Sequence, residues 1–213
     1  MSKTKLHLLP FHQYGGVNRE DPLRFYYWPV IGGLYRQRLE QCLDECSGGK
    51  RILEVGFGTG VSFLNLKNIY LEIHGIDLTA DIERVKLTFA GMELPLHLRK
   101  GDVKHIDYPN DYFDTVLLVS ILEHLRPSEQ KAAFMEIARV LKPGGQAIVG
   151  IPVERPFMAG MFRLMGVDIR EHHFSTEVEI VNAAENFLLQ LRQQPMRVPI
   201  IGEIYRVVHF VKK

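Results

Sequence analysis

The sequence predicts an α/β fold built on one mostly parallel sheet of seven strands, with helices on both faces and an antiparallel last strand. Strand and helix patterns alternate from about residue 50 onward. Residues 115–119 form a continuous apolar run, which is typical of a central parallel strand buried on both faces. The last two strand candidates have no helix between them, so we expect one of them to run antiparallel.

The length and composition favour a single folded unit. The chain has 213 residues, of which 46% are hydrophobic and 24% charged, so it can bury a substantial core. Its 26 basic and 25 acidic residues give a formal net charge of +1, and we therefore expect no nucleic-acid partner. No apolar run reaches the length of about 18 residues that crosses a bilayer. We expect a cytoplasmic protein without integral membrane contact.

The N-terminal part is predicted to be an arm followed by an amphipathic helix. In residues 29–46, apolar side chains recur at steps of three and four, as one buried helix face requires. A seam at residues 47–49, Ser-Gly-Gly, separates residues 1–47, which we expect to cap the active site, from the main domain at 48–213. Cys42 and Cys46 share a helix face without further ligands, so we predict free thiols and no metal site.

The remaining elements follow from apolar patterns and turn residues. A well-marked helix is expected to begin at Ser128 as its N-cap and to end at residues 142–145, Lys-Pro-Gly-Gly. The other predicted helices cover residues 60–69, 80–90 and 177–186. The predicted strands cover residues 51–55, 71–77, 94–99, 112–120, 146–151, 188–191 and 204–211.

A glycine-rich turn carries the strongest functional signal. Glu54 begins the segment Glu-Val-Gly-Phe-Gly-Thr-Gly, which ends at Gly60, directly after a predicted strand and at the start of a predicted helix. Glycines permit a tight turn and let a ligand approach the backbone. The dinucleotide fingerprint would require a third glycine at Val61, so the pattern differs from that motif. A purely structural turn is the alternative.

With this motif, the chain resembles the class I (Rossmann-like) S-adenosylmethionine-dependent methyltransferases of the small-molecule type, over about residues 50–153. The resemblance implies S-adenosylmethionine as the cofactor, with Glu54 holding its amino-acid end. A sulfonium and an ammonium cation favour a nearby carboxylate. The turn residues that the resemblance places against the cofactor are Gly56, Phe57, Gly58 and Gly60.

Further cofactor-binding candidates follow the next strands. Asp77, followed by Leu78, can accept hydrogen bonds from ribose hydroxyls, although it could instead cap the next helix, a role that Thr79 already fills. The resemblance implies that Asp102 bonds the adenine amino group while Val103 packs on the ring; the alternative for Asp102 is an ordinary turn residue. Ser120, just past the central strand, is expected to touch the methionine portion.

The acceptor is expected beyond the carboxyl ends of the strands, near residues 120–124. An apolar, Met-rich insertion at residues 153–174 suits a lid over a small or lipid-like acceptor, and a short core helix is the alternative. His124 and His173 are the candidate general bases, because imidazole titrates near neutral pH. Either histidine could instead have a supporting role.

The predicted function is therefore the transfer of a methyl group to an O, N or C atom of a small-molecule acceptor by direct displacement. A nicotinamide-dependent oxidoreductase is disfavoured by Val61. The other alternative is a catalytically silent member of the fold that serves as a cofactor-binding or partner subunit. The sequence leaves the acceptor and the oligomeric state open.

Overall fold

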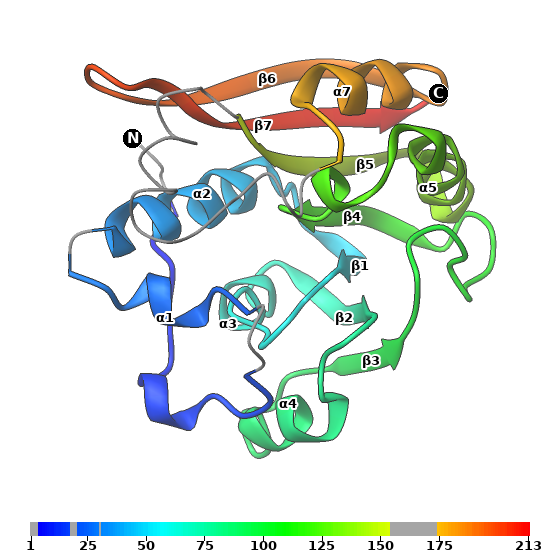
Figure 1. Ribbon diagram of the computed structural model, residues 1–213. Coiled ribbons are helices and arrows are strands. Elements are labelled where there is room, and N and C mark those ends of the chain that lie inside the picture. The colour runs from blue at the N-terminus through cyan, green and yellow to red at the C-terminus, as the bar shows by residue number, and fades with distance from the viewer. Residues whose placement is uncertain (1–3, 18–20, 30, 154–173) are drawn as a thin grey trace.

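The computed structural model describes residues 4–17, 21–29, 31–153 and 174–213. A seven-stranded sheet with strand order β3-β2-β1-β4-β5-β7-β6 forms the centre of the molecule, and helices lie on both of its sides (Figure 1). The predicted α/β class and the number of strands are confirmed.

The strands pair as the apolar patterns predicted. The first five are parallel, and β7 runs antiparallel to both β5 and β6, which confirms the expected antiparallel last strand. Their bounds are β1 Gly49–Val55, β2 Tyr70–Asp77, β3 Leu96–Lys100, β4 Phe113–Val119, β5 Leu141–Pro152, β6 Leu188–Val198 and β7 Gly202–Lys212.

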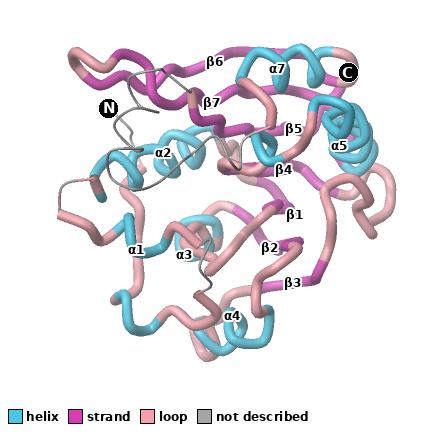
Figure 2. The backbone as a smooth tube through the Cα atoms, in the orientation of Figure 1, coloured by secondary structure: helices cyan, strands magenta, loops and turns pink. Residues whose placement is uncertain are grey.

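The helices divide between the two faces of the sheet (Figures 1 and 2). One face carries α1 (Leu23–Tyr26), α2 (Gly32–Glu45), α3 (Phe63–Leu66) and α4 (Ile82–Thr88). The opposite face carries α5 (Pro127–Val140) and α7 (Glu177–Glu185). Two short 3-10 helices, η1 (Phe11–Gln13) and η2 (Leu122–His124), complete the described elements. No helix among the described residues is long and apolar enough to cross a membrane.

Three predicted element details are wrong. The helix expected at residues 60–69 shrinks to the four residues of α3, because Gly60 has φ +75° and the chain reaches Phe63 only through turns. The N-cap of α5 is Arg126 rather than Ser128, since Pro127 takes the first helical position, which suits its fixed φ and missing N–H. The N-cap of α4 is Asp81, which accepts from Arg84 N, rather than Thr79.

The C-terminal end of α5 also differs from the prediction. The helix ends at Val140 and β5 begins at once with Leu141, so residues 142–145 belong to an irregular start of this strand. The register between β4 and β5 shifts there, and Gly144 has φ +73°. The Lys-Pro-Gly-Gly sequence therefore forms an irregular first part of β5, directly after the helix.

The N-terminal arm is fastened along the helices of one face. Thr4 N and Leu6 N donate to carboxylates on α2, and His7 N donates to Asn65 Oδ1, 3.0 Å away on α3. Farther along, Gly15 N donates to Thr88 Oγ1 of α4 at 2.8 Å. The arm therefore follows the side of the molecule that leads to the glycine turn.

Candidate functional site

The glycine turn is where the structure concentrates predicted site residues. Strand β1 carries Glu54 near its end, and this carboxylate is buried, with 4% of its surface exposed. The turn that follows has positive φ at Gly56, Gly58 and Gly60, conformations that other residues rarely adopt. Sequence and backbone geometry agree at this turn.

The protein itself packs against the glycines. A Cβ atom at Gly56 would lie 2.1 Å from the Ile121 side chain, and one at Gly58 would lie 2.8 Å from Asp21 Oδ2. Phe57 is buried and packs on Phe63, with ring centroids 5.8 Å apart, so its side chain points into the core. Only the backbone of Phe57 is placed to face a ligand at this turn.

Glu54 has an unusual electrostatic environment. Desolvation by burial raises the pKa of its carboxyl to about 8, and the nearby charge of Asp77 acts in the same direction. The hydroxyl of Ser62, itself buried, donates to Glu54 and partly opposes this rise. A carboxylate in this position is stabilised by a bound cation, since a positive charge favours its ionised form.

Asp77 ties two turns together at the end of β2. Its Oδ2 accepts from Gly58 N at 2.9 Å, and its Oδ1 accepts from Thr79 N and Ala80 N, both at 2.8 Å. The side chain therefore fixes the glycine turn relative to the β2–α4 connection. It caps neither end of α4, whose N-cap is Asp81.

The other predicted contact residues, which follow β2 and β3, differ in their exposure. Leu78 is 57% exposed and presents apolar surface beside Asp77. Val103, by contrast, is buried in the core cluster on the α5 side. Asp102 accepts from Lys104 N at 2.9 Å within a turn, and its bond to the adenine amino group stays a prediction.

Ser120 follows β4 in a left-handed conformation, with φ +57°. Its backbone N donates to Gly150 O at 2.9 Å, and its Oγ lies 3.1 Å from the hydroxyl of Tyr205 on β7. Tyr205 is fully buried, so its hydroxyl fixes the rotamer of Ser120 from β7, which is separated from β4 by β5.

The two predicted histidine bases have different outcomes. His124 is exposed at the end of η2, beside the carboxyl edge of β4. His173 and nearly all of the insertion predicted at residues 153–174 lie outside the described residues. The described flanks are well anchored: Val153 N donates to Ile204 O, and Phe174 N donates to Glu123 O at 2.8 Å.

Sequence reasoning missed two residues that reach this edge from outside the motifs, Asp21 and Arg38, whereas Tyr26 is an aromatic residue of the arm that was expected to cover the site. Asp21, on the arm, lies against Gly58 and is hydrogen-bonded to Thr59, while its burial raises the pKa of its carboxyl. Tyr26 on α1 is buried and bonded to Arg38 of α2. No sequence pattern linked Asp21 or Arg38 to the glycine turn, because the arm and helix approach it only in the folded chain.

Arg38 is a half-buried cation among aromatic rings. Its guanidinium carbon lies 4.1 Å from the Tyr35 ring centroid and 5.1 Å from that of Tyr205. Desolvation opposes its charge, but the neighbouring phenols and Glu123 outweigh this, so the pKa of Arg38 is raised. Its Nε atom is buried without a hydrogen-bond partner among the described residues. Such an orphaned donor suits an anionic or carbonyl group of a ligand.

Comparisons with known proteins show a likeness to methyltransferases over the middle of the chain. Residues 53–149 match the family model described as a methyltransferase domain. Phosphatidylethanolamine N-methyltransferase of Cereibacter sphaeroides is 34% identical over 104 residues, 47% of this chain and 50% of that protein. The ubiquinone/menaquinone biosynthesis C-methyltransferase UbiE of Vibrio vulnificus strain YJ016 is 31% identical over 130 residues, 56% of this chain and 48% of that protein.

A solved structure extends the likeness over nearly the whole chain. N-methyltransferase NodS from Bradyrhizobium japonicum WM9, in complex with S-adenosyl-L-homocysteine, superposes with a TM-score of 0.70 at 16% identity. The match covers 92% of this chain and 94% of that one. The chain therefore shares the Rossmann-like fold of this solved structure, and residues 53–149 match a methyltransferase domain, as the motifs predicted. The chain spans about half the length of the curated relatives that it matches.

Proposed function

We propose that this protein binds S-adenosylmethionine at the carboxyl edge of β1, β2 and β4 and transfers its methyl group to a small-molecule acceptor. The observation that carries the proposal is Glu54, a buried carboxylate whose pKa is raised to about 8 beside the glycine turn. The donor set at this edge fits the cofactor, because a cationic ligand would stabilise the ionised Glu54. When bound, S-adenosylmethionine supplies an electrophilic methyl group on a sulfonium.

The charges at this edge divide into two sets that match the two ends of an amino acid. Glu54 offers a negative charge for an ammonium group, whereas half-buried Arg38 offers a positive charge, with a buried Nε that has no partner among the described residues, for a carboxylate. Tyr26 lies near both, since the charges of Arg38 and Glu54 both act on its pKa. We assign Arg38 and Glu54 to opposite ends of the methionine portion.

The remaining candidates take roles at the ribose, the adenine and the acceptor. Asp77 already orders the glycine turn and keeps some acceptor capacity for ribose hydroxyls. Exposed Leu78 offers an apolar surface to the adenine, with Asp102 close by on the chain after β3. Ser120 and His124 border the position for the acceptor, where alignment of the reacting atoms supplies most of the rate.

The N-terminal residues would cover the site, and the acceptor would be apolar. Residues 1–47 would close the cofactor edge through Asp21 and Tyr26, and the main domain would be residues 48–213. The relatives named above include a phosphatidylethanolamine and a ubiquinone/menaquinone methyltransferase, which favours an apolar or lipid-like acceptor. A cytoplasmic location and the absence of a nucleic-acid partner stay predictions from the sequence.

Transfer of a labelled methyl group tests the activity. We would incubate the protein with S-adenosylmethionine labelled in the methyl group, together with lipid and polar small-molecule extracts, and measure the label in each fraction. The proposal expects label in the organic-soluble fraction, with much less from a Gly58→Val variant, whose side chain would meet Asp21. Cofactor binding without labelled product in any fraction would favour a catalytically silent member of the fold.

A further inference from the structure

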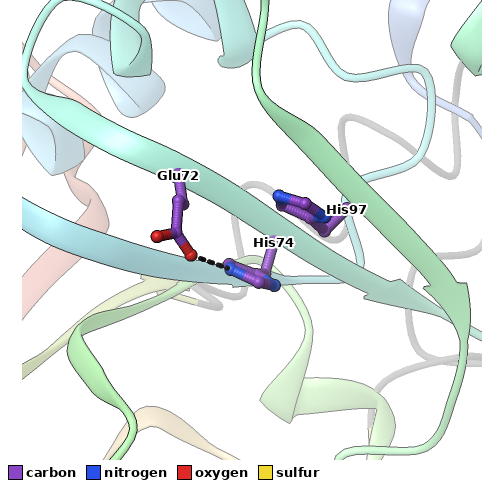
Figure 3. A group of neighbouring side chains, drawn as sticks. All are labelled: Glu72, His74 and His97. Atoms are coloured by element: carbon purple, nitrogen blue, oxygen red, sulfur yellow. Dashed lines mark hydrogen bonds and ion pairs between the residues drawn. The ribbon is translucent and has the colours of Figure 1, made fainter.

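A second group of functional side chains lies on β2 and β3, outside the cofactor edge. Glu72 and His74 are two residues apart on β2, so they share one face of the sheet. His97 is the Cα partner of His74 on β3, the edge strand. Figure 3 shows the three side chains beside one another on these two strands. One possible ligand atom from each residue lies within 4.8 Å of the others.

The distances suit a tetrahedral metal ion. Glu72 Oε2 and His74 Nε2 are 3.3 Å apart. Two ligands that each lie 2.0–2.1 Å from a tetrahedral zinc ion are separated by about 3.3 Å. This pair therefore needs little movement to share an ion. The ring of His97 now stacks on His74, with centroids 4.6 Å apart and planes at 20°, and must turn to point its nitrogen inward. Because His97 is exposed, it has room to do so.

The surroundings hold the central histidine in place. The Tyr108 hydroxyl lies 3.1 Å from His74 Nδ1, which leaves Nε2 on the side of Glu72. A hydrogen bond at the second ring nitrogen is the usual way in which proteins orient a metal-binding histidine. Tyr112 and Phe113 pack edge-on against the same ring. His74 is consequently a pre-positioned ligand, whereas His97 is an adjustable one.

We propose that Glu72, His74 and His97 bind one divalent transition-metal ion, with zinc as the best match and water as the fourth ligand. Two imidazoles and one carboxylate are ligands that zinc accepts. The ion would join the edge strand β3 to β2 and stabilise the sheet, without a part in the chemistry. This site is independent of the proposed methyl transfer, and its residues were missed because they form no linear motif.

One interaction competes with the metal and sets the expected affinity. Arg51 Nε donates to Glu72 Oε2 at 2.7 Å, and Lys50 Nζ lies 3.9 Å from Oε1. An ion must displace Arg51 from this oxygen, so we expect micromolar rather than tighter binding. The displaced guanidinium keeps a partner, since its carbon lies 4.2 Å from the Tyr112 ring centroid.

Cobalt titration of the metal-free full chain tests the site. Co²⁺ substitutes for zinc and reports imidazole ligation by its visible absorption bands. We expect one Co²⁺ per chain with micromolar affinity, displaced by Zn²⁺. His97→Ala and Glu72→Gln should each weaken binding at least tenfold, whereas His12→Ala, an exposed histidine on η1, should not change it. Arg51→Met should strengthen binding several-fold.

Two outcomes would overturn the proposal. One is the absence of saturable cobalt binding at millimolar metal in a protein that circular dichroism shows to be folded. The other is equal cobalt affinity in the wild type, His97→Ala and Glu72→Gln, which would place any bound ion elsewhere on the chain. Cofactor binding is measured separately in each variant and is expected to stay unchanged, so failure of this site leaves the proposed activity untouched.

Discussion

At the scale of single residues, Glu54 shows how a binding site can oppose stability. Its pKa of about 8 lies above the ordinary glutamate value of 4.5, because burial disfavours the ionised form. The folded state therefore binds more protons than the unfolded state between these two pKa values. Stability is fully kept below the lower value and falls as pH rises through the folded pKa. A group with this cost is expected where a cationic ligand compensates it.

The first prediction concerns Glu54→Gln. Glutamine keeps the shape and can still accept from Ser62, but it carries no buried charge. We expect the free energy of unfolding at about pH 8 to rise by one to a few kcal/mol, with little gain at about pH 4. Urea unfolding at the two pH values measures this difference. An equal effect at both would mean that ionisation of Glu54 is not its cause.

The second prediction concerns Arg38. Arg38→Met should weaken S-adenosylmethionine binding by tenfold or more, since hydrogen bonds to charged groups contribute about 1.5–3 kcal/mol. The decarboxylated cofactor should bind the wild type and the variant with similar affinity, because it lacks the group that Arg38 is proposed to bind. Arg24→Met is the matched control, because Arg24 also stacks on an aromatic ring, Phe25, but is exposed. A similar loss with both cofactors would make Arg38 a purely structural residue.

At the scale of elements, α2 is joined to the far strands by a buried carboxylate. Glu45, at the end of α2, accepts from Arg192 Nε and Gln194 Nε2, both at 2.6 Å, and its Oε2 lies 3.0 Å from His209 Nδ1. Its side chain is 1% exposed. This network crosses from the helix to β6 and β7, and it holds α2, which carries Arg38, against the sheet.

The third prediction tests this network. Glu45→Ala removes the common acceptor of exposed Arg192, half-buried Gln194 and buried His209, and it should lower the free energy of unfolding by about 1–3 kcal/mol. The control is Glu83→Ala on α4, whose exposed pair with Lys86 should contribute no more than about 1 kcal/mol. Chemical denaturation measures both. Equal losses of unfolding free energy in the two variants would show that the buried contacts of Glu45 stabilise the protein no more than an exposed ion pair does.

Elements with strong apolar patterns were predictable, and their ends were not. The strands of the parallel core and the two long helices, α2 and α5, followed from periodicity because tertiary packing and local pattern agree there. The N-caps at Arg126 and Asp81 depended on Pro127 and on the course of the chain after β2, which periodicity does not encode. The β6–β7 ribbon is longer than its apolar pattern because its outer positions are polar and partly exposed.

At the scale of the whole molecule, the site combines residues that the sequence predicts with residues that reach it only through tertiary contacts. Glu54, Asp77 and the glycines follow adjacent parallel strands, so the sequence places them together. Asp21 and Arg38 reach the same edge from the arm and from α2 through contacts that no local pattern predicts, and Tyr26 joins them from the aromatic arm. Tyr205 arrives from the opposite end of the chain and fixes Ser120.

The fourth prediction follows from the fastening of the arm. Removal of residues 1–27 should weaken S-adenosylmethionine binding at least tenfold, because it deletes Asp21 and Tyr26 and exposes Arg38. Equilibrium dialysis measures the affinity, and circular dichroism checks that the sheet stays folded. Unchanged affinity in a folded, truncated chain would contradict a role for the arm as the cover of the site.

The most direct test of the cofactor site is titration calorimetry with S-adenosylmethionine at about pH 6.5, in two buffers of different ionisation enthalpy. At this pH free Glu54 is protonated, since its pKa is about 8, so binding of a cation must release a proton. We expect micromolar binding with release of nearly one proton by the wild type and none by Glu54→Gln. Absence of binding, or equal proton release by both proteins, would contradict the proposed cofactor site.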